Sequence, residues 1–185
     1  MLNVKSLACF LAAIFVAIST LAASINVGEA PATVAIQKGG EIIPHGDDFQ
    51  YRTWSIANLV GRVGLIQHQA ARKGVNALNK PLIDAIKAAM FPSEKFQVAT
   101  IVNIDDAMWG TGGLVAGELK KNKKKFPKSV IVADEDGETL KAWGLKPKGS
   151  AITVVDSKGR VVFFKDGVLD EEEVLKVVEL IGDML

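Results

Sequence analysis

Cysteine is almost absent from this chain. The 185 residues contain one, Cys9, and it lies within an apolar stretch near the N-terminus. A disulfide needs two cysteines, and thiol–disulfide exchange needs at least one accessible thiolate. The segment that follows the apolar stretch therefore has no disulfide to stabilise it and no CxxC pair. We expect its stability to come from packing alone.

An excess of charge of either sign is also missing. The chain has 22 Lys and Arg, 21 Asp and Glu, and a net charge of +1. Loss of residues 1–24 would remove Lys5 and no acid, which would leave no net charge. A neutral domain has no general electrostatic attraction for nucleic acid or an anionic membrane. We therefore expect no nucleic-acid partner.

The N-terminus has the pattern of an export signal. Lys5 precedes an uninterrupted apolar run, Leu7–Ile18, and small residues follow up to Ser24. This order predicts a signal peptide over residues 1–24, export to the periplasm and no stable membrane insertion after cleavage. A retained anchor and the choice of cleavage site stay open. Cys9 lies too early in the run for a lipid-modified cysteine.

Residues 25–185 have the length of one domain with a full core. Nearly continuous apolar runs predict buried strands, and amphipathic spacing predicts helices. The run Lys80–Met90 reads as a helix with Asn79 as its N-cap and Pro81 in its first turn. Asp170 and Glu173 have the spacing of a capping box for a final helix. The predicted strands are Thr33–Ile36, Glu41–Ile43, Gly61–His68, Gln97–Ile104, Ser129–Ala133, Ala151–Val155 and Arg160–Phe164.

Further helices are predicted at Leu114–Lys125, which Pro127 follows, and before Gly144. Strands and helices alternate until a closing hairpin at Asp156–Gly159. Parallel crossovers need helices to cover them, so this order predicts an α/β fold: a mixed central sheet with helices on both faces and one antiparallel edge.

Several short phrases of the sequence together resemble a known family. They are Tyr51–Trp54, Gln67–Arg72, Thr100–Ala107, Asn122–Lys124 and Lys165–Gly167. Their order and spacing are similar to those of the YtfJ family, small exported bacterial proteins. The resemblance implies a thioredoxin-like fold of the peroxiredoxin and TlpA type. It implies no activity, because the family has none established, although a transcriptional-regulator label has been attached to it.

The resemblance also shows what this chain lacks. In redox members of the fold a cysteine pair would fall near Arg72 and Val75, and a cis-proline would fall at Ser150. Arginine and valine cannot form a thiolate. The resemblance therefore implies the scaffold without its usual chemistry.

In open α/β sheets, ligands bind beyond the carboxyl ends of the strands. There the side chains could bind a carboxylate or a peptide end, with Arg72 as a forked donor. The alternative is that Arg72 pairs with a loop aspartate and only fixes the turn. The candidate ligand-binding residues are His68, Gln69, Arg72, Asn103, Asp105, Asp106, Trp109 and Ser150.

Other sites are weaker. Asp105 and Asp106 alone do not complete the ligand set of a hard cation, and the two histidines lack the spacing of a zinc site. The lysine run 120–125 reads as a solvated helix end. The glycines of 110–113 lack phosphate-loop spacing. We therefore expect no metal, no cofactor and no catalytic residue.

The leading hypothesis is an accessory module, without redox activity, that binds a periplasmic protein, a peptide or a small anion. A second hypothesis is metal-assisted hydrolysis by His68, Asp105 and Asp106. A third follows the regulator label, although the sequence has no helix-turn-helix pattern and no basic excess.

Overall fold

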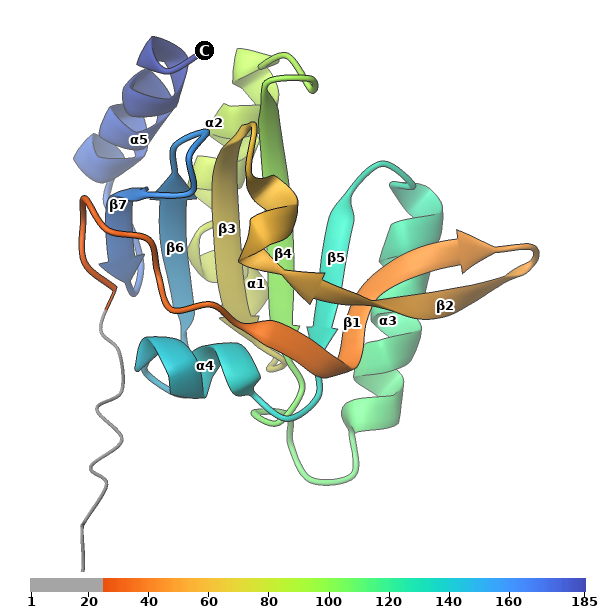
Figure 1. Cartoon of the computed structure of the whole chain (residues 1–185). Coiled ribbons are helices and arrows are strands. Elements are labelled where there is room, and N and C mark those ends of the chain that lie inside the picture. Colours follow the sequence, from red (N-terminus) through yellow and green to blue (C-terminus); the bar gives the residue numbers. More distant parts are fainter. Residues whose placement is uncertain (1–24) are drawn as a thin grey trace, which may run out of the picture.

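The computed structural model describes residues 25–185, and the predicted signal peptide lies outside them. Within those residues no helix is long and apolar enough to cross a membrane. One seven-stranded sheet forms the centre of the structure (Figure 1). Its order is β2-β1-β5-β4-β3-β6-β7. The strands are β1 (Ala35–His45), β2 (Asp48–Ser55), β3 (Val63–Ala70), β4 (Phe96–Asn103), β5 (Val130–Asp134), β6 (Ser150–Val155) and β7 (Val161–Asp166).

The three central strands β3, β4 and β5 are parallel, and both flanks are antiparallel. The β6–β7 hairpin forms one flank, as predicted. The β1–β2 hairpin forms the other, which the sequence did not predict. The mixed α/β sheet expected from the element order is thus confirmed, with one more antiparallel edge.

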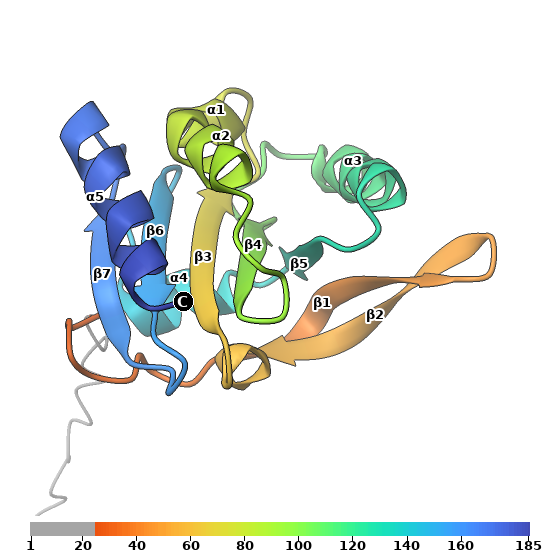
Figure 2. The ribbon, with the colours of Figure 1, turned by 90° about the horizontal axis from the view of Figure 1, so that it is seen from above.

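Helices cover both faces of the sheet (Figure 2). The helices α2, α3 and α5 lie on one face, while α4 and the 3₁₀ helix η1 lie on the other. Successive side chains of a strand point to opposite faces, so each buried strand supplies both cores. The helices are η1 (Ile56–Leu59), α1 (Val75–Leu78), α2 (Lys80–Ala89), α3 (Gly112–Lys125), α4 (Glu138–Trp143) and α5 (Glu171–Asp183).

The predicted helix ends are mostly confirmed. Asp170 accepts a hydrogen bond from the Glu173 amide at 2.8 Å, and Glu173 accepts one from the Asp170 amide at 3.0 Å. Gly144 closes α4 in the left-handed conformation, with φ 63°. Two orphan amides of α5 are satisfied by this capping box.

The first strand differs from its prediction. Two short strands were expected near its ends, but β1 is continuous and has a bulge between Ile36 and Glu41. Gly39 and Gly40 supply the bulge, with φ 91° and 107°. A Cβ on Gly40 would lie 2.4 Å from the Arg52 carbonyl oxygen, so no other residue fits there. The glycine pair is visible in the sequence, but the local sequence does not indicate which strands lie against it.

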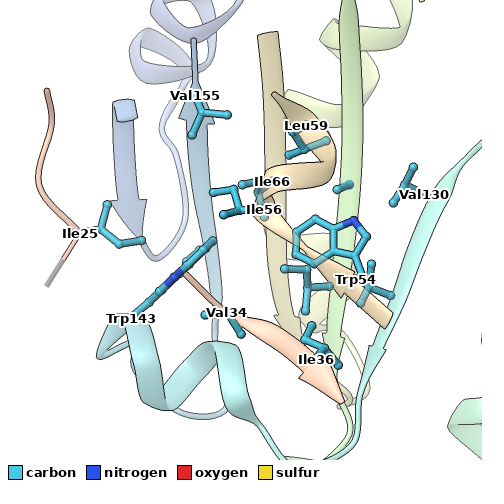
Figure 3. Close-up of a cluster of buried hydrophobic side chains, with 14 of the residues drawn as sticks. Ile25, Val34, Ile36, Trp54, Ile56, Leu59, Ile66, Val130, Trp143 and Val155 are labelled. Atoms are coloured by element: carbon cyan, nitrogen blue, oxygen red, sulfur yellow. The ribbon is translucent and has the colours of Figure 1, made fainter. Parts of the chain in front are cut away.

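The largest apolar cluster lies on the α4 face (Figure 3). Trp54 and Trp143 are its largest side chains, and each is at most 2% exposed. The Trp143 indole N–H donates to the Ala32 carbonyl at 2.9 Å. Both tryptophans therefore belong to the core, where the apolar ring is buried and the indole N–H of Trp143 has a partner.

Candidate functional site

The loop after β3 contains Arg72, and α1 begins at Val75. These are the two positions near which the resemblance predicts the cysteine pair of redox members. Val75 is buried, so its side chain belongs to the core. The Arg72 Nε donates to the Asp106 backbone carbonyl at 2.8 Å. That bond connects the β3–α1 loop to the β4–α3 loop. It leaves the two terminal nitrogens of the guanidinium without a hydrogen bond within residues 25–185.

A cavity of about 510 Å³ opens between the β3–α1 loop and α3. We call it the loop groove. One wall is the loop itself, and the other is the first three turns of α3 with its apolar side chains. The residues that line it are Gln69, Ala70, Ala71, Arg72, Lys73, Gly74, Asn76, Val102, Met108, Thr111, Leu114, Val115, Glu118, Leu119 and Asn122.

Of the eight predicted site residues, Gln69 and Arg72 line the loop groove. Trp109 follows Met108 at its edge, but the Trp109 side chain is fully exposed and does not cover the groove. Lys73, Asn76 and the α3 side chains are groove residues that the sequence reasoning missed. The apolar positions of α3 could have suggested a wall there.

His68 lies on the other face of the sheet. His68 and Gln69 are consecutive in β3, and a pleated strand directs neighbours to opposite sides. The His68 side chain is buried, and its Nε2 atom has no hydrogen-bond partner within residues 25–185. Burial lowers the pKa of His68 from 6.5 to about 4. The carboxylates of Asp134, Asp106 and Asp166 raise that pKa, but burial outweighs them. The imidazole is therefore neutral at pH 7.

Asn103, Asp106 and Asp105 form a polar network beyond the end of β4. The buried Asn103 Nδ2 donates to the Asp106 carboxylate at 3.2 Å, and the Lys148 amide donates to the same oxygen at 2.8 Å. The exposed Asp105 lies 3.6 Å from the Lys141 ammonium. Each carboxylate therefore has a partner within the protein, and the pair fixes two loops.

Ser150 is buried and belongs to a structural tie. Its hydroxyl donates to the His68 carbonyl at 3.0 Å and accepts from the Asn79 Nδ2 at 3.2 Å. The Asn79 Nδ2 also donates to the Gly167 carbonyl at 3.0 Å, and its Oδ1 accepts from the Leu169 amide at 3.0 Å. Asn79 was predicted to cap α2. It stands at that position, but its side chain makes no capping bond. It joins the start of α2 to β6 and to the β7–α5 turn.

Asp134 is a second buried polar residue that the sequence reasoning missed. Its carboxylate accepts from the Glu138 and Thr139 amides, each at 2.9 Å. These bonds give partners to two backbone amides in the first turn of α4, and they come from the end of β5, four residues before the helix. Asp134 is fully buried, so it acts within the fold and not on a ligand.

The predicted site therefore divides into two parts. Gln69 and Arg72 face the loop groove, whereas His68, Asn103 and Ser150 are interior. No three His, Cys, Asp or Glu side chains lie close enough to hold a metal ion within residues 25–185. The loop groove combines an apolar wall, amide groups and the Arg72 and Lys73 cations. This arrangement is able to bind a ligand that has both an apolar part and an anionic group.

Solved structures with this fold confirm the scaffold. The chain is similar to the thioredoxin domain of a thiol-disulfide oxidoreductase from Bacteroides vulgatus, with a TM-score of 0.57, 14% identity, and coverage of 85% of this chain and 98% of that one. It is also similar to a thiol-disulfide isomerase from Corynebacterium glutamicum, with a TM-score of 0.52, 18% identity, and coverage of 86% and 96%. The fold is thioredoxin-like.

A short match also exists to a sucrose operon repressor from Vibrio alginolyticus. It is 51% identical over 37 residues, which are 20% of this chain and 39% of that protein. A match of this extent does not define the family of the whole chain.

Curated relatives match nearly the whole chain. The uncharacterized protein YtfJ of Escherichia coli is 41% identical over 160 residues, or 86% of this chain and 87% of that protein. An uncharacterized protein of Haemophilus influenzae is 37% identical over 166 residues, or 90% of each. The model of the family described as "Bacterial protein of unknown function (YtfJ_HI0045)" matches residues 25–184. The chain belongs to the YtfJ family.

Proposed function

We propose that this protein is a periplasmic binding module without thiol chemistry, which holds a peptide, a protein segment or a small anion in the loop groove. The observation that carries the proposal is the groove itself. It lies beyond the end of β3, near the positions where the resemblance predicts the cysteines of redox proteins, and its polar residues on that side are Gln69, Arg72, Lys73 and Asn76. The loop groove has room for a ligand, but it has no cysteine that could react with one.

Charge supports an anionic ligand. The Arg72 Nε is used within the protein, but its two terminal nitrogens make no hydrogen bond within residues 25–185. Lys73 is exposed and makes no ion pair there. Glu118 is the one acid that lines the groove. A carboxylate in the groove would meet two cations, Arg72 and Lys73. Arg72 could donate to it through both terminal nitrogens of its guanidinium.

The periplasmic part of the proposal rests on the export-signal pattern of residues 1–24 alone. Cell fractionation tests it: the protein should be recovered from the periplasm, shortened at its N-terminus. Recovery of the full-length chain from the cytoplasm would favour the regulator hypothesis instead.

Photo-crosslinking in cells tests the binding site. A photoreactive residue in place of Lys73, at the groove, should trap a specific partner or ligand. The same residue in place of Lys158, exposed in the β6–β7 turn, is the matched control. Equal products from both positions, or products from Lys158 alone, would refute a site in the loop groove. Hydrolysis of test esters that depends on added metal would support the enzyme hypothesis.

A further inference from the structure

The central strand β4 is only partly covered on its helical face. Val98 and Thr100 point to that face and are only half-buried, although β4 has neighbours on both sides. Viewed from above, α2 and α3 stand apart over this strand (Figure 2). A cavity of about 350 Å³ lies between them, which we call the inter-helix cavity. Its lining residues are Gln69, Ile83, Ile86, Lys87, Val98, Thr100, Val102, Leu119, Asn122, Phe126, Ser129, Val130 and Ile131.

The inter-helix cavity adjoins the loop groove. Four residues line both of them, namely Gln69, Val102, Leu119 and Asn122. Helix α3 and its C-cap residue Phe126 form a wall of both, from Leu114 in the loop groove to Phe126 in the cavity. At 1.5 Å per residue, these two side chains are roughly 18 Å apart along the helix. The two cavities therefore make one elongated path with a polar end at Arg72.

The charges along this path favour an anion. Arg72 and Lys73 stand at the polar end, against one acid, Glu118. Lys87 lines the inter-helix cavity, and no acid lines it. Asp84, one turn before Lys87, is paired with Lys80. A cationic ligand would therefore meet like charges along the path.

The inter-helix cavity suits an alkyl chain better than a peptide. An extended peptide carries an amide at every residue, and each needs a hydrogen-bond partner when buried. Neither β3 nor β5 leaves an edge of β4 free to supply such partners. The walls are mainly Ile, Val, Leu and Phe side chains. A volume of about 350 Å³ lies at the lower end of the range for small-ligand pockets, and is too small for a helix.

We propose that the ligand is a fatty acid with a single alkyl chain, its carboxylate at Arg72 and Lys73 and its tail between α2 and α3. This inference rests on the proposed function, because it uses the loop groove for the head group. It adds the chemical class of the ligand and a second compartment for its tail.

The test is a titration of the purified protein with dodecanoate below its micelle concentration, followed by backbone NMR. The shifts should include Val98 to Val102 and α3 as well as the β3–α1 loop. Dodecyltrimethylammonium has the same chain and the opposite charge, and should bind roughly tenfold more weakly. Acetate, which has the head group without the tail, should shift only the loop.

Two variants separate the ends of the ligand. Lys73→Gln should weaken dodecanoate by about two- to fivefold, whereas Lys158→Gln, the same change far from the path, should leave it unchanged. Phe126→Ser should weaken both amphiphiles without unfolding the protein, because Phe126 is 53% exposed.

The outcomes are distinct. Dodecanoate shifts confined to the loop, or equal affinity for both amphiphiles, would overturn the fatty-acid inference and leave the proposed function standing. If peptides shift the NMR signals of the loop and dodecanoate shifts none, the fatty-acid inference is likewise overturned and the proposed function stands. No shift in the loop with any anion or peptide would remove the proposed function itself.

Discussion

Acidification should destabilise this protein through His68 before its carboxylates are protonated. The imidazole is buried and neutral in the folded state, where its pKa is lowered from 6.5 to about 4. In the unfolded chain the same group takes up a proton near pH 6.5. The unfolded state therefore binds more protons than the folded state between these two values, and stability falls as the pH falls.

The size of the effect follows from the two pKa values. One pH unit of difference corresponds to 1.36 kcal/mol, so the full loss between pH 6.5 and about 4 is about 3 kcal/mol. Between pH 6.5 and 5 the loss should be about 2 kcal/mol. Above about pH 7.5 the imidazole is neutral in both states and contributes no slope. The carboxylates with lowered pKa, which include Asp156 and Glu173, lose their contribution as the pH falls through their unfolded values of 3.8 and 4.5, so their loss lies mainly below about pH 5.

Urea unfolding at a series of pH values between 7.5 and 5 provides the assay. The free energy of unfolding should level off toward pH 7.5 and should decline by slightly more than about 1 kcal/mol per pH unit at its steepest, near pH 5. His68→Gln removes the titrating group and should abolish the decline. His45→Gln is the matched control, because His45 is exposed at the end of β1, and it should keep the wild-type slope. A wild-type profile that is flat to pH 5, or one that His68→Gln leaves unchanged, would refute the reasoning.

Four further substitutions test the fold. Asn79→Ala should lower the free energy of unfolding by about 3 kcal/mol, because three groups in β6 and the β7–α5 turn lose their hydrogen bonds to Asn79; a loss below 1 kcal/mol would show that the tie contributes little. Asp170→Ala removes the α5 cap and should cost about 1 kcal/mol in the same urea assay, and no change would argue against the capping box. Gly137→Ala should cost about 1–2 kcal/mol because φ is +63°. Gly117→Ala, in mid-helix with no nearby atoms, should instead stabilise α3 by about 1 kcal/mol, and equal effects at both glycines would contradict the backbone argument.

The sequence was informative about elements whose signals are local. The apolar run around Leu65, the capping box at Asp170 and the left-handed Gly144 each act within a few residues, and each appears in the structure as predicted. Chain order then led to the mixed sheet, because parallel crossovers need covering helices.

The parts that depend on distant contacts were not predictable in the same way. The bulge at Gly39 and Gly40 exists because two other strands pass close by, and their register is not written in the local sequence. The role of Asn79 depends on residues 71 to 90 positions away, so its side chain read as an ordinary N-cap.

The candidate site shows both cases in one strand. The strand-end rule led to the correct edge, because Gln69 and Arg72 line the loop groove. His68 was grouped with them although alternation in β3 directs it to the opposite face. The inter-helix cavity arises from the spacing of α2 and α3, which no local pattern specifies.

The most direct test of a binding role without thiol chemistry is the reduction of insulin disulfides by the purified full-length protein in the presence of dithiothreitol. If the edge after β3 binds a ligand and does not exchange disulfides, the rate should equal that of a protein-free blank. A rate above the blank that persists in a Cys9→Ser variant and is lost in Arg72→Gln would contradict it, because the groove would then be carrying out the chemistry of its redox relatives.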